Sequence, residues 1–170
     1  MPLGGRSEGA EDSGGTSDFT STAMCGSCYR ATVTSEPPEP TARHRIHVSA
    51  AVILDAAGRL LVVRKAGTTA FMQPGGKPEP GESSSETLSR ELDEELGIRL
   101  DPGELRALGS FTAAAANEPG FLVVADVFEV DIGVQLPRVG AEIAELRWVS
   151  RGDAEQIEIA PLAREYFLPL

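Results

Sequence analysis

The amino-acid sequence predicts an α/β fold from two patterns that alternate along the chain. Short apolar runs bounded by turn residues, which are typical of β-strands, recur after residue 45. Between them, residues 83–96 carry three leucines four positions apart, a spacing that places them on one face of a helix. The chain has 170 residues, 41% of them hydrophobic, so we expect one domain with a sizeable core.

The expected strands begin close to residue 45. Residues 48–54 form an apolar run, the sequence Asp-Ala-Ala-Gly at 55–58 is a turn, and residues 59–64 form a second run, which together predict a β-hairpin. A loop at 67–71 leads into a short strand that reaches Gln73. The remaining elements are expected as strands at 105–115, 121–130 and 145–149 and a final helix within residues 153–167.

The helix in the middle of the chain has clear signals at both ends. Ser83 and Glu86 have the spacing of a capping box, which places the helix N-terminus there, and Gly97 is suited to end it. The helix also concentrates negative charge. Its acidic residues fill four of five positions, namely Glu91, Asp93, Glu94 and Glu95.

This acidic cluster suggests a metal site. On a helical wheel the three glutamates fall within about 100° of one another, beside the leucine stripe. Like charges at this spacing repel one another unless a positive group lies among them, and a hard divalent cation with oxygen ligands is the simplest candidate. A solvated acidic surface is the alternative reading of the helix by itself.

Residues 76–98 resemble the Nudix box, the motif of the Nudix hydrolases. The motif combines a glycine, four acidic positions, an arginine, two aliphatic positions and a closing glycine at fixed spacing. The matching residues are Gly76, Glu82, Arg90, Glu91, Leu92, Glu94, Glu95, Gly97 and Ile98. The resemblance is to MutT-type members, extends loosely over residues 45–170, and implies a Nudix-like mixed β-sheet sandwiched between α-helices.

Two positions depart from what such boxes usually carry. Thr87 stands where a small residue commonly packs the helix, and Gln73 stands where many relatives have an aromatic residue or leucine. Neither departure removes a carboxylate, so both bear on packing and substrate fit rather than on the metal.

The resemblance also implies a set of metal ligands. Glu94 and Glu95 are the first candidates, and Glu91 is expected to be a ligand or the general base. The backbone carbonyl of Gly75 is implied as a further ligand, which suits a tight Pro-Gly-Gly turn where a backbone can approach closely. Glu82 is expected to bind a further ion or its water.

Two further residues complete the predicted site. Arg90 is expected to orient the carboxylates rather than to contact substrate. Relatives usually recruit one acidic residue from outside the box, and Glu142, six residues before Trp148, is our first choice, with Glu145 second. An exposed loop carboxylate is the alternative reading of Glu142.

The expected reaction is hydrolysis of a diphosphate bond in a nucleoside diphosphate linked to another group. Mg²⁺ or Mn²⁺ is the expected cofactor, and water attacks phosphorus. The missing signatures of other subfamilies leave a nucleoside triphosphate or a modified nucleotide as the expected substrate.

Two alternatives to this reaction stay open. One is a non-catalytic Nudix domain that binds or senses a nucleotide. The other is an isoprenoid diphosphate isomerase, which would need a catalytic cysteine within residues 44–170, where the sequence has none.

Composition and missing motifs narrow the other classes. No Gly-x-Ser-x-Gly elbow occurs, and Pro78 stands where a P-loop needs Ser or Thr after Gly-Lys. A net charge of −11 disfavours nucleic acid as a partner. With no 18-residue apolar run and no signal-peptide core, a cytoplasmic protein without a membrane partner is expected. Nothing in the sequence indicates the oligomeric state.

Residues 1–43 differ in composition from the rest of the chain. They are rich in Gly, Ser, Thr, Pro and Glu, and their large aliphatic residues are only Leu3, Met24 and Val33. Such a segment cannot bury enough apolar surface to offset its ordering entropy, so we predict a disordered N-terminal tail followed by the Nudix domain at 44–170. Whether Met1 or Met24 is the true start stays open.

Both cysteines and both histidines lie near the end of this tail. Cys25, Cys28, His44 and His47 are the residue types of a Cys2His2 zinc site. The two histidines are separated by only two residues, shorter than usual, and His47 falls on the first predicted strand. We therefore expect a pair of reduced cysteines rather than a zinc site.

Overall fold

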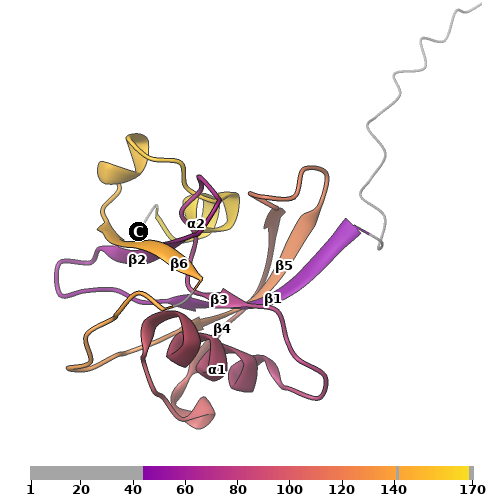
Figure 1. Cartoon of the computed structure of the whole chain (residues 1–170), viewed down its shortest axis with the longest axis vertical. Helices are drawn as coiled ribbons and strands as arrows, with labels where there is room; N and C mark the ends of the chain where they lie inside the picture. Colours follow the sequence, from indigo (N-terminus) through magenta and orange to yellow (C-terminus); the bar gives the residue numbers. More distant parts are fainter. Residues whose placement is uncertain (1–43, 141, 169–170) are drawn as a thin grey trace, which may run out of the picture. The chain divides into compact units, whose positions relative to one another are not determined.

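The structure is a computed structural model that describes residues 44–140 and 142–168. Its strands form two β-sheets, with helix α1 on one side of them and helix α2 on the other (Figure 1). The predicted α/β fold with a mixed sheet between helices is confirmed. The predicted tail at 1–43, with Cys25 and Cys28, lies outside the described residues.

Six strands, two α-helices and two turns of 3-10 helix make up the fold. In chain order they are β1 (Arg45–Val52), β2 (Leu60–Lys65), β3 (Gly75–Gly76), α1 (Ser84–Leu96), η2 (Pro102–Glu104), β4 (Arg106–Ala114), β5 (Leu122–Glu129), β6 (Ile143–Val149), η3 (Asp153–Glu155) and α2 (Pro161–Tyr166). Within the described part of the chain, no helix is long and apolar enough to cross a bilayer.

The larger sheet is mixed. Its strand order is β3-β1-β5-β4, and the smaller sheet pairs β2 with β6. β1 runs parallel to β5, whereas the other ladders are antiparallel. Strands β4 and β5 form a hairpin, so β1 sits in the middle of the sheet between β3 and β5.

The hairpin predicted for residues 48–54 and 59–64 is wrong in its pairing. Its turn forms, because the Gly58 N–H donates to the Asp55 carbonyl at 2.9 Å and Gly58 adopts a φ of 73°. Beyond one bridge between Leu54 and Leu60 the strands part, and β2 pairs with β6. Both runs are buried on both faces, so their sequences did not distinguish a neighbouring partner from a distant one.

One other boundary differs from the prediction. The short strand expected to end at Gln73 is β3, at Gly75–Gly76, which isolated bridges at Phe71 and Met72 precede. The final helix forms within the predicted residues, as α2, and the separate 3-10 turn η3 precedes it because Ile159 bridges Phe71 between them.

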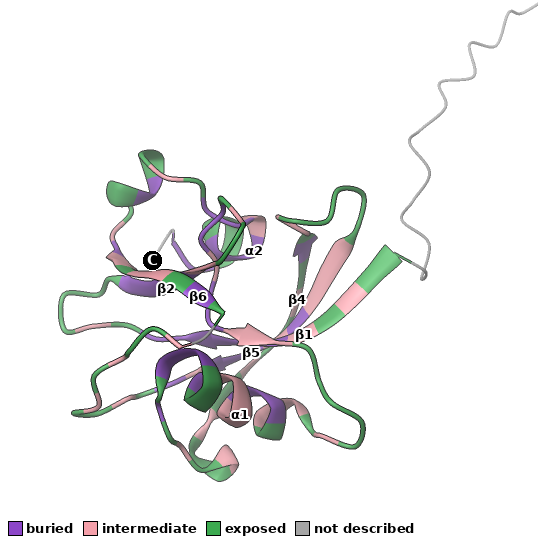
Figure 2. Cartoon of the chain, in the orientation of Figure 1, coloured by how far each residue is buried: buried purple, intermediate pink, exposed green. Residues whose placement is uncertain are grey.

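The core has two layers, one on each face of the sheets. Along β2, Leu60 and Val62 pack into the cluster that contains the α2 residues, whereas Leu61 and Val63 pack against the α1 leucines. Successive side chains of a strand point to opposite faces, so one apolar strand contributes to both layers. Figure 2 shows this burial along the strands and on the inward faces of both helices.

Helix α1 forms where the sequence predicted it. Ser83 Oγ accepts a hydrogen bond from the Glu86 N–H at 3.3 Å, and Glu86 Oε2 accepts one from the Ser83 N–H at 2.8 Å. Gly97 ends the helix with a φ of 66°. The three stripe leucines are fully buried, which fixes the face on which the helix presents its acidic side chains.

Candidate active site

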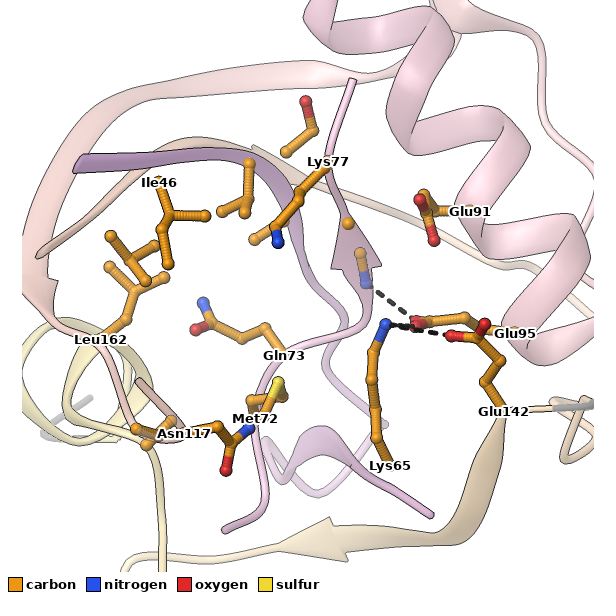
Figure 3. Close-up of a pocket in the computed structure, with 18 of the residues that line it drawn as sticks. Ile46, Lys65, Met72, Gln73, Lys77, Glu91, Glu95, Asn117, Glu142 and Leu162 are labelled. Atoms are coloured by element: carbon orange, nitrogen blue, oxygen red, sulfur yellow. Dashed lines mark hydrogen bonds and ion pairs between the residues drawn. The ribbon is translucent and has the colours of Figure 1, made fainter. Parts of the chain in front are cut away.

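A cavity of about 780 Å³ lies where α1, β1, β3 and the start of α2 meet. This volume is within the range typical of small-molecule sites. In Figure 3, Lys65, Glu91, Glu95 and Glu142 lie toward one end of the cavity, the charged end, whereas Ile46 and Leu162 lie toward the other, the aliphatic end. Arg90 and Glu94 also line the cavity, and the Lys77 side chain points toward Gln73 and Ile46.

The α1 carboxylates differ sharply in burial. The side chain of Glu95 is 4% exposed and that of Glu91 is 13% exposed, whereas that of Glu94 is 60% exposed. The difference follows from the helix register, because Glu95 precedes a fully buried leucine and lies against β3, as Figure 3 shows.

Glu95 is held by the backbone of β3 and by a lysine of β2. Its Oε2 accepts a hydrogen bond from the Gly75 N–H at 2.9 Å, and its Oε1 lies 3.1 Å from Lys65 Nζ. Burial raises the pKa of Glu95, although the Gly75 N–H and Lys65 oppose this shift. Lys65 Nζ also lies 3.6 Å from Glu142 Oε2, so one lysine contacts a carboxylate from α1 and one from the segment before β6.

The pKa of Lys65 is raised. Burial acts to lower it, but Glu95, together with Glu91 and Glu142, outweighs the effect of burial. Lys65 therefore stays a cation that faces the cavity from β2.

Arg90 contacts the three acidic side chains of the box other than Glu95. It binds Glu82 through two hydrogen bonds of 2.7 Å and 3.1 Å, and its Nη1 lies 3.0 Å from Glu91 Oε1 and 3.3 Å from Glu94 Oε2. Its Nη2 also donates to the Lys77 carbonyl at 3.1 Å. These contacts spread one positive charge among three carboxylates and tie α1 to the loop before it.

The Glu82 carboxylate accepts several hydrogen bonds within this network. Hydrogen bonds from Arg90, and then from the Glu79 backbone N–H and the Thr87 hydroxyl, lower the pKa of Glu82 to about 2. Unlike the other carboxylates of the box, Glu82 does not line the cavity.

The Pro-Gly-Gly turn brings backbone close to the carboxylates. Gly75 has a φ of 139°, a conformation that favours glycine, and a Cβ there would lie 2.0 Å from the Ser49 carbonyl oxygen. At Gly76 a Cβ would lie 2.2 Å from Glu91 Oε1. Glycine at both positions therefore lets β3 lie between β1 and α1.

The structure brings most of the predicted site residues to one cavity. Those that line it are Gly75, Arg90, Glu91, Glu94, Glu95 and Glu142. Glu145, the second choice outside the box, instead binds Arg64 at 3.1 Å and Arg147 at 2.6 Å. Among the residues that the structure describes, no three His, Cys, Asp or Glu side chains converge as a ready-made ion site.

Sequence reasoning missed several polar residues of the cavity, among them Lys65, Lys77 and Asn117. Lys65 is the last residue of the apolar strand β2, where a cation is an ordinary strand end, so no signal marked it. Gln73 was noted only as a departure from the family pattern that bears on packing and substrate fit.

The donor set of the charged end fits a hard divalent cation. Carboxylate and backbone carbonyl oxygens are the ligands that Mg²⁺ and similar ions prefer. Glu95 Oε1 is buried and its contact among the described residues is the ion pair with Lys65 Nζ at 3.1 Å, so a carboxylate oxygen with two lone pairs can still accept a further ligand there. Glu91 and the Gly75 backbone lie beside it on the same side of the cavity.

Comparison with known proteins places the chain in a family. The sequence profile of the NUDIX domain matches residues 43–170. An isopentenyl-diphosphate Delta-isomerase from Cutibacterium acnes is 31% identical over 88% of this chain and 82% of that protein. A putative 8-oxo-dGTP diphosphatase from Bacillus subtilis is 31% identical over 59% of this chain and 64% of that protein.

The fold is shared with solved structures. The crystal structure of a MutT protein from Methanosarcina mazei superimposes with a TM-score of 0.58 at 28% identity, over 72% of this chain and 90% of that one. The profile match covers more than half of the chain and includes every element described above. The chain belongs to the Nudix family, as a hydrolase of the pyrophosphohydrolase type.

Proposed function

We propose that this chain hydrolyses a nucleoside triphosphate, or a modified form of one, with Mg²⁺ or Mn²⁺ as cofactor. The products are the nucleoside monophosphate and inorganic diphosphate. Nudix hydrolases act on nucleotide-linked diphosphates and generally use divalent cations, and the B. subtilis relative is named for a nucleoside triphosphate. The observation that carries the proposal is one cavity that combines carboxylates and lysines with aliphatic side chains and room for an organic group.

In this proposal Glu91, Glu94, Glu95 and the Gly75 carbonyl would hold the metal, and Glu82 would assist through a further ion or its water. A bound divalent cation supplies charge neutralisation for the phosphates and lowers the pKa of a bound water.

The chain's own side chains do the rest. Lys65 at the charged end, and Lys77, which lines the same cavity, can bind phosphate oxygens by charge-assisted hydrogen bonds. Arg90 positions Glu91 and Glu94 through its contacts with both. Glu91, or Glu142 beside Glu95 and Lys65, accepts the proton of the attacking water while the bond from phosphorus to the leaving phosphate oxygen breaks.

An isomerase activity like that named for the C. acnes relative is the second candidate. Such chemistry was expected to need a catalytic cysteine in the domain, and both cysteines of this chain, Cys25 and Cys28, precede it. The retained carboxylates likewise favour hydrolysis over a domain that only binds or senses a nucleotide.

The proposal is tested by a screen of nucleoside triphosphates, oxidised forms included, with Mg²⁺ or Mn²⁺. We expect release of diphosphate from at least one of them and none when EDTA replaces the metal. Isopentenyl diphosphate is the matched control. If it is isomerised while every nucleotide stays intact, the second candidate replaces the first.

Metal binding is expected to stabilise the fold. When a cation binds only the folded form and its concentration is about a hundredfold above its dissociation constant, it raises the free energy of unfolding by roughly 2.7 kcal/mol. Thermal unfolding should therefore shift upward with MgCl₂ or MnCl₂ and much less with NaCl of equal ionic strength, which only screens charge.

Two glutamine variants check where the ion binds. Glu94→Gln should reduce the shift, whereas Glu165→Gln, which changes an exposed carboxylate outside the cavity, should keep it. A metal-induced shift that is the same in both variants would remove Glu94 from the ligand set.

A further inference from the structure

One buried polar atom of the cavity has no partner among the described residues, and it is Gln73 Nε2. Glu95 Oε1 also lacks a hydrogen bond of good geometry, but Lys65 Nζ lies 3.1 Å from it as an ion pair. Buried polar groups in native proteins are nearly always hydrogen-bonded, so the unpaired amide nitrogen of Gln73 needs an explanation.

Gln73 is a buried side chain that faces the cavity. It is 5% exposed, and it lies two residues before Gly75 in the segment that leads into β3. Figure 3 shows its amide at some distance from the carboxylates, on the side of the cavity where Ile46 and Leu162 lie. The amide therefore meets the organic part of a substrate whose phosphates lie at the charged end.

The surroundings of this amide are mostly aliphatic. Ile46, Val48, Met72, Val123 and Leu162 line the cavity, and Figure 3 shows Lys77 and Asn117 as the charged and polar side chains labelled on the same side as Gln73. Among the residues that the structure describes, none that lines the cavity is aromatic, so Phe71, Phe111, Phe121 and Phe128 supply no stacking platform there. Phe71 and Phe128 are instead in the core.

An amide in such surroundings discriminates between classes of ligand. A hydrogen bond is strengthened by a low local dielectric, and an unpaired polar group is costly there. A hydrocarbon chain would leave the Gln73 amide unpaired, whereas a heterocycle with a carbonyl oxygen or ring nitrogen on its edge would pair it. Side-chain amides pair well with the edges of bases, through one donor and one acceptor.

We propose that the side-chain amide of Gln73 binds the edge of the substrate's base and that this hydrogen bond, rather than stacking on a ring, sets the base preference of the enzyme. The inference rests on the proposed function, because it assigns the organic end of the same cavity. It makes Gln73 a specificity-determining residue and assigns the aliphatic end to a nucleobase rather than to an isoprenoid chain.

The central experiment compares wild type with Gln73→Met, a change that keeps the length of the side chain but removes its amide. We expect kcat/KM for the preferred nucleoside triphosphate to fall about tenfold to a hundredfold, mainly through KM. The spread of kcat/KM among the other bases should narrow. Ribose 5-triphosphate, which has no base, should be hydrolysed equally well by both proteins.

A structural role for Gln73 would give a different pattern. Because the variant removes an unpaired buried donor, its melting temperature without substrate should be unchanged or higher. Gln156→Met makes the same chemical change at an exposed glutamine outside the cavity and should alter neither base preference nor melting temperature. A lower melting temperature of Gln73→Met with unchanged base preference would show that the amide supports the fold alone.

The outcomes separate the two proposals. If wild type cleaves no nucleotide, the proposed function fails. If wild type cleaves nucleotides and Gln73→Met keeps the same rates and base preference, only the role of Gln73 is overturned. If Gln73→Met does not fold, Gln73→Glu tests the same donor, because it replaces the amide nitrogen with an oxygen. In addition, kcat/KM of wild type for its best nucleotide must exceed kcat/KM for ribose 5-triphosphate by at least about tenfold.

Discussion

Glu95→Gln is expected to lower kcat by at least about a hundredfold while the protein keeps its fold. The change removes the charge of the most buried carboxylate of the box and preserves its shape. Even partners that only support a metal ligand cost 10-fold to 100-fold when removed, so loss of a ligand charge should cost at least as much. The measurement is hydrolysis at saturating Mg²⁺, with circular dichroism on the same samples.

The fold should survive this change for an electrostatic reason. Burial raises the pKa of Glu95, which means that burial already disfavours its charged form, and a neutral amide can still accept the Gly75 N–H. Glu165→Gln serves as the matched control with full activity. Turnover of Glu95→Gln close to wild type would remove Glu95 from the metal site.

Gly75→Ala is expected to destabilise the domain by about 3 kcal/mol or more. The new Cβ would lie 2.0 Å from the Ser49 carbonyl oxygen and 3.0 Å from Ala50 Cα, and both atoms belong to the backbone of β1. Neither can move aside by a rotamer change, and a φ of 139° is unfavourable for alanine as well. For a domain of this size the melting temperature should fall by roughly 10 °C or more, measured by circular dichroism.

Two other glycines provide the controls for this prediction. Gly152→Ala should leave the melting temperature nearly unchanged, because the nearest atom to its Cβ is Ser150 Oγ at 3.9 Å. At Gly76 the clash is with the Glu91 carboxylate, a side chain that can move, so Gly76→Ala should lose activity with a smaller loss of stability. A Gly75→Ala protein as stable as wild type would mean that β3 does not lie this close to β1.

Helix α1 shows how far local sequence signals carry. Its start at Ser83, its end at Gly97 and its buried leucine stripe were all predicted, because caps and helix faces depend on residues no more than four positions apart. The carboxylates of the box were found for the same reason, since they share that helix.

Strand pairing shows where local signals stop. The run at 48–54 pairs with β5, so that Val48 lies opposite Ala125, and nothing near Val48 encodes that choice. The turn at 55–58 was predicted correctly, yet the strands on either side of it belong mainly to different sheets. Pairing depends on contacts between segments distant in the sequence, which an apolar pattern does not specify.

The sequence by itself determined the family, the helix and the acidic residues predicted to bind a metal, because all three depend on one continuous segment of the chain. Only the tertiary structure decided that Glu95 is buried while Glu94 is exposed, and that Lys65 contacts Glu95 and Glu142. It alone showed that Gln73 is buried, that its Nε2 has no partner among the described residues, and that it lies on the side of the cavity where Ile46 and Leu162 lie. Burial and the lack of a partner depend on how β1, β2, α1 and α2 pack together, and no single stretch of sequence contains that information.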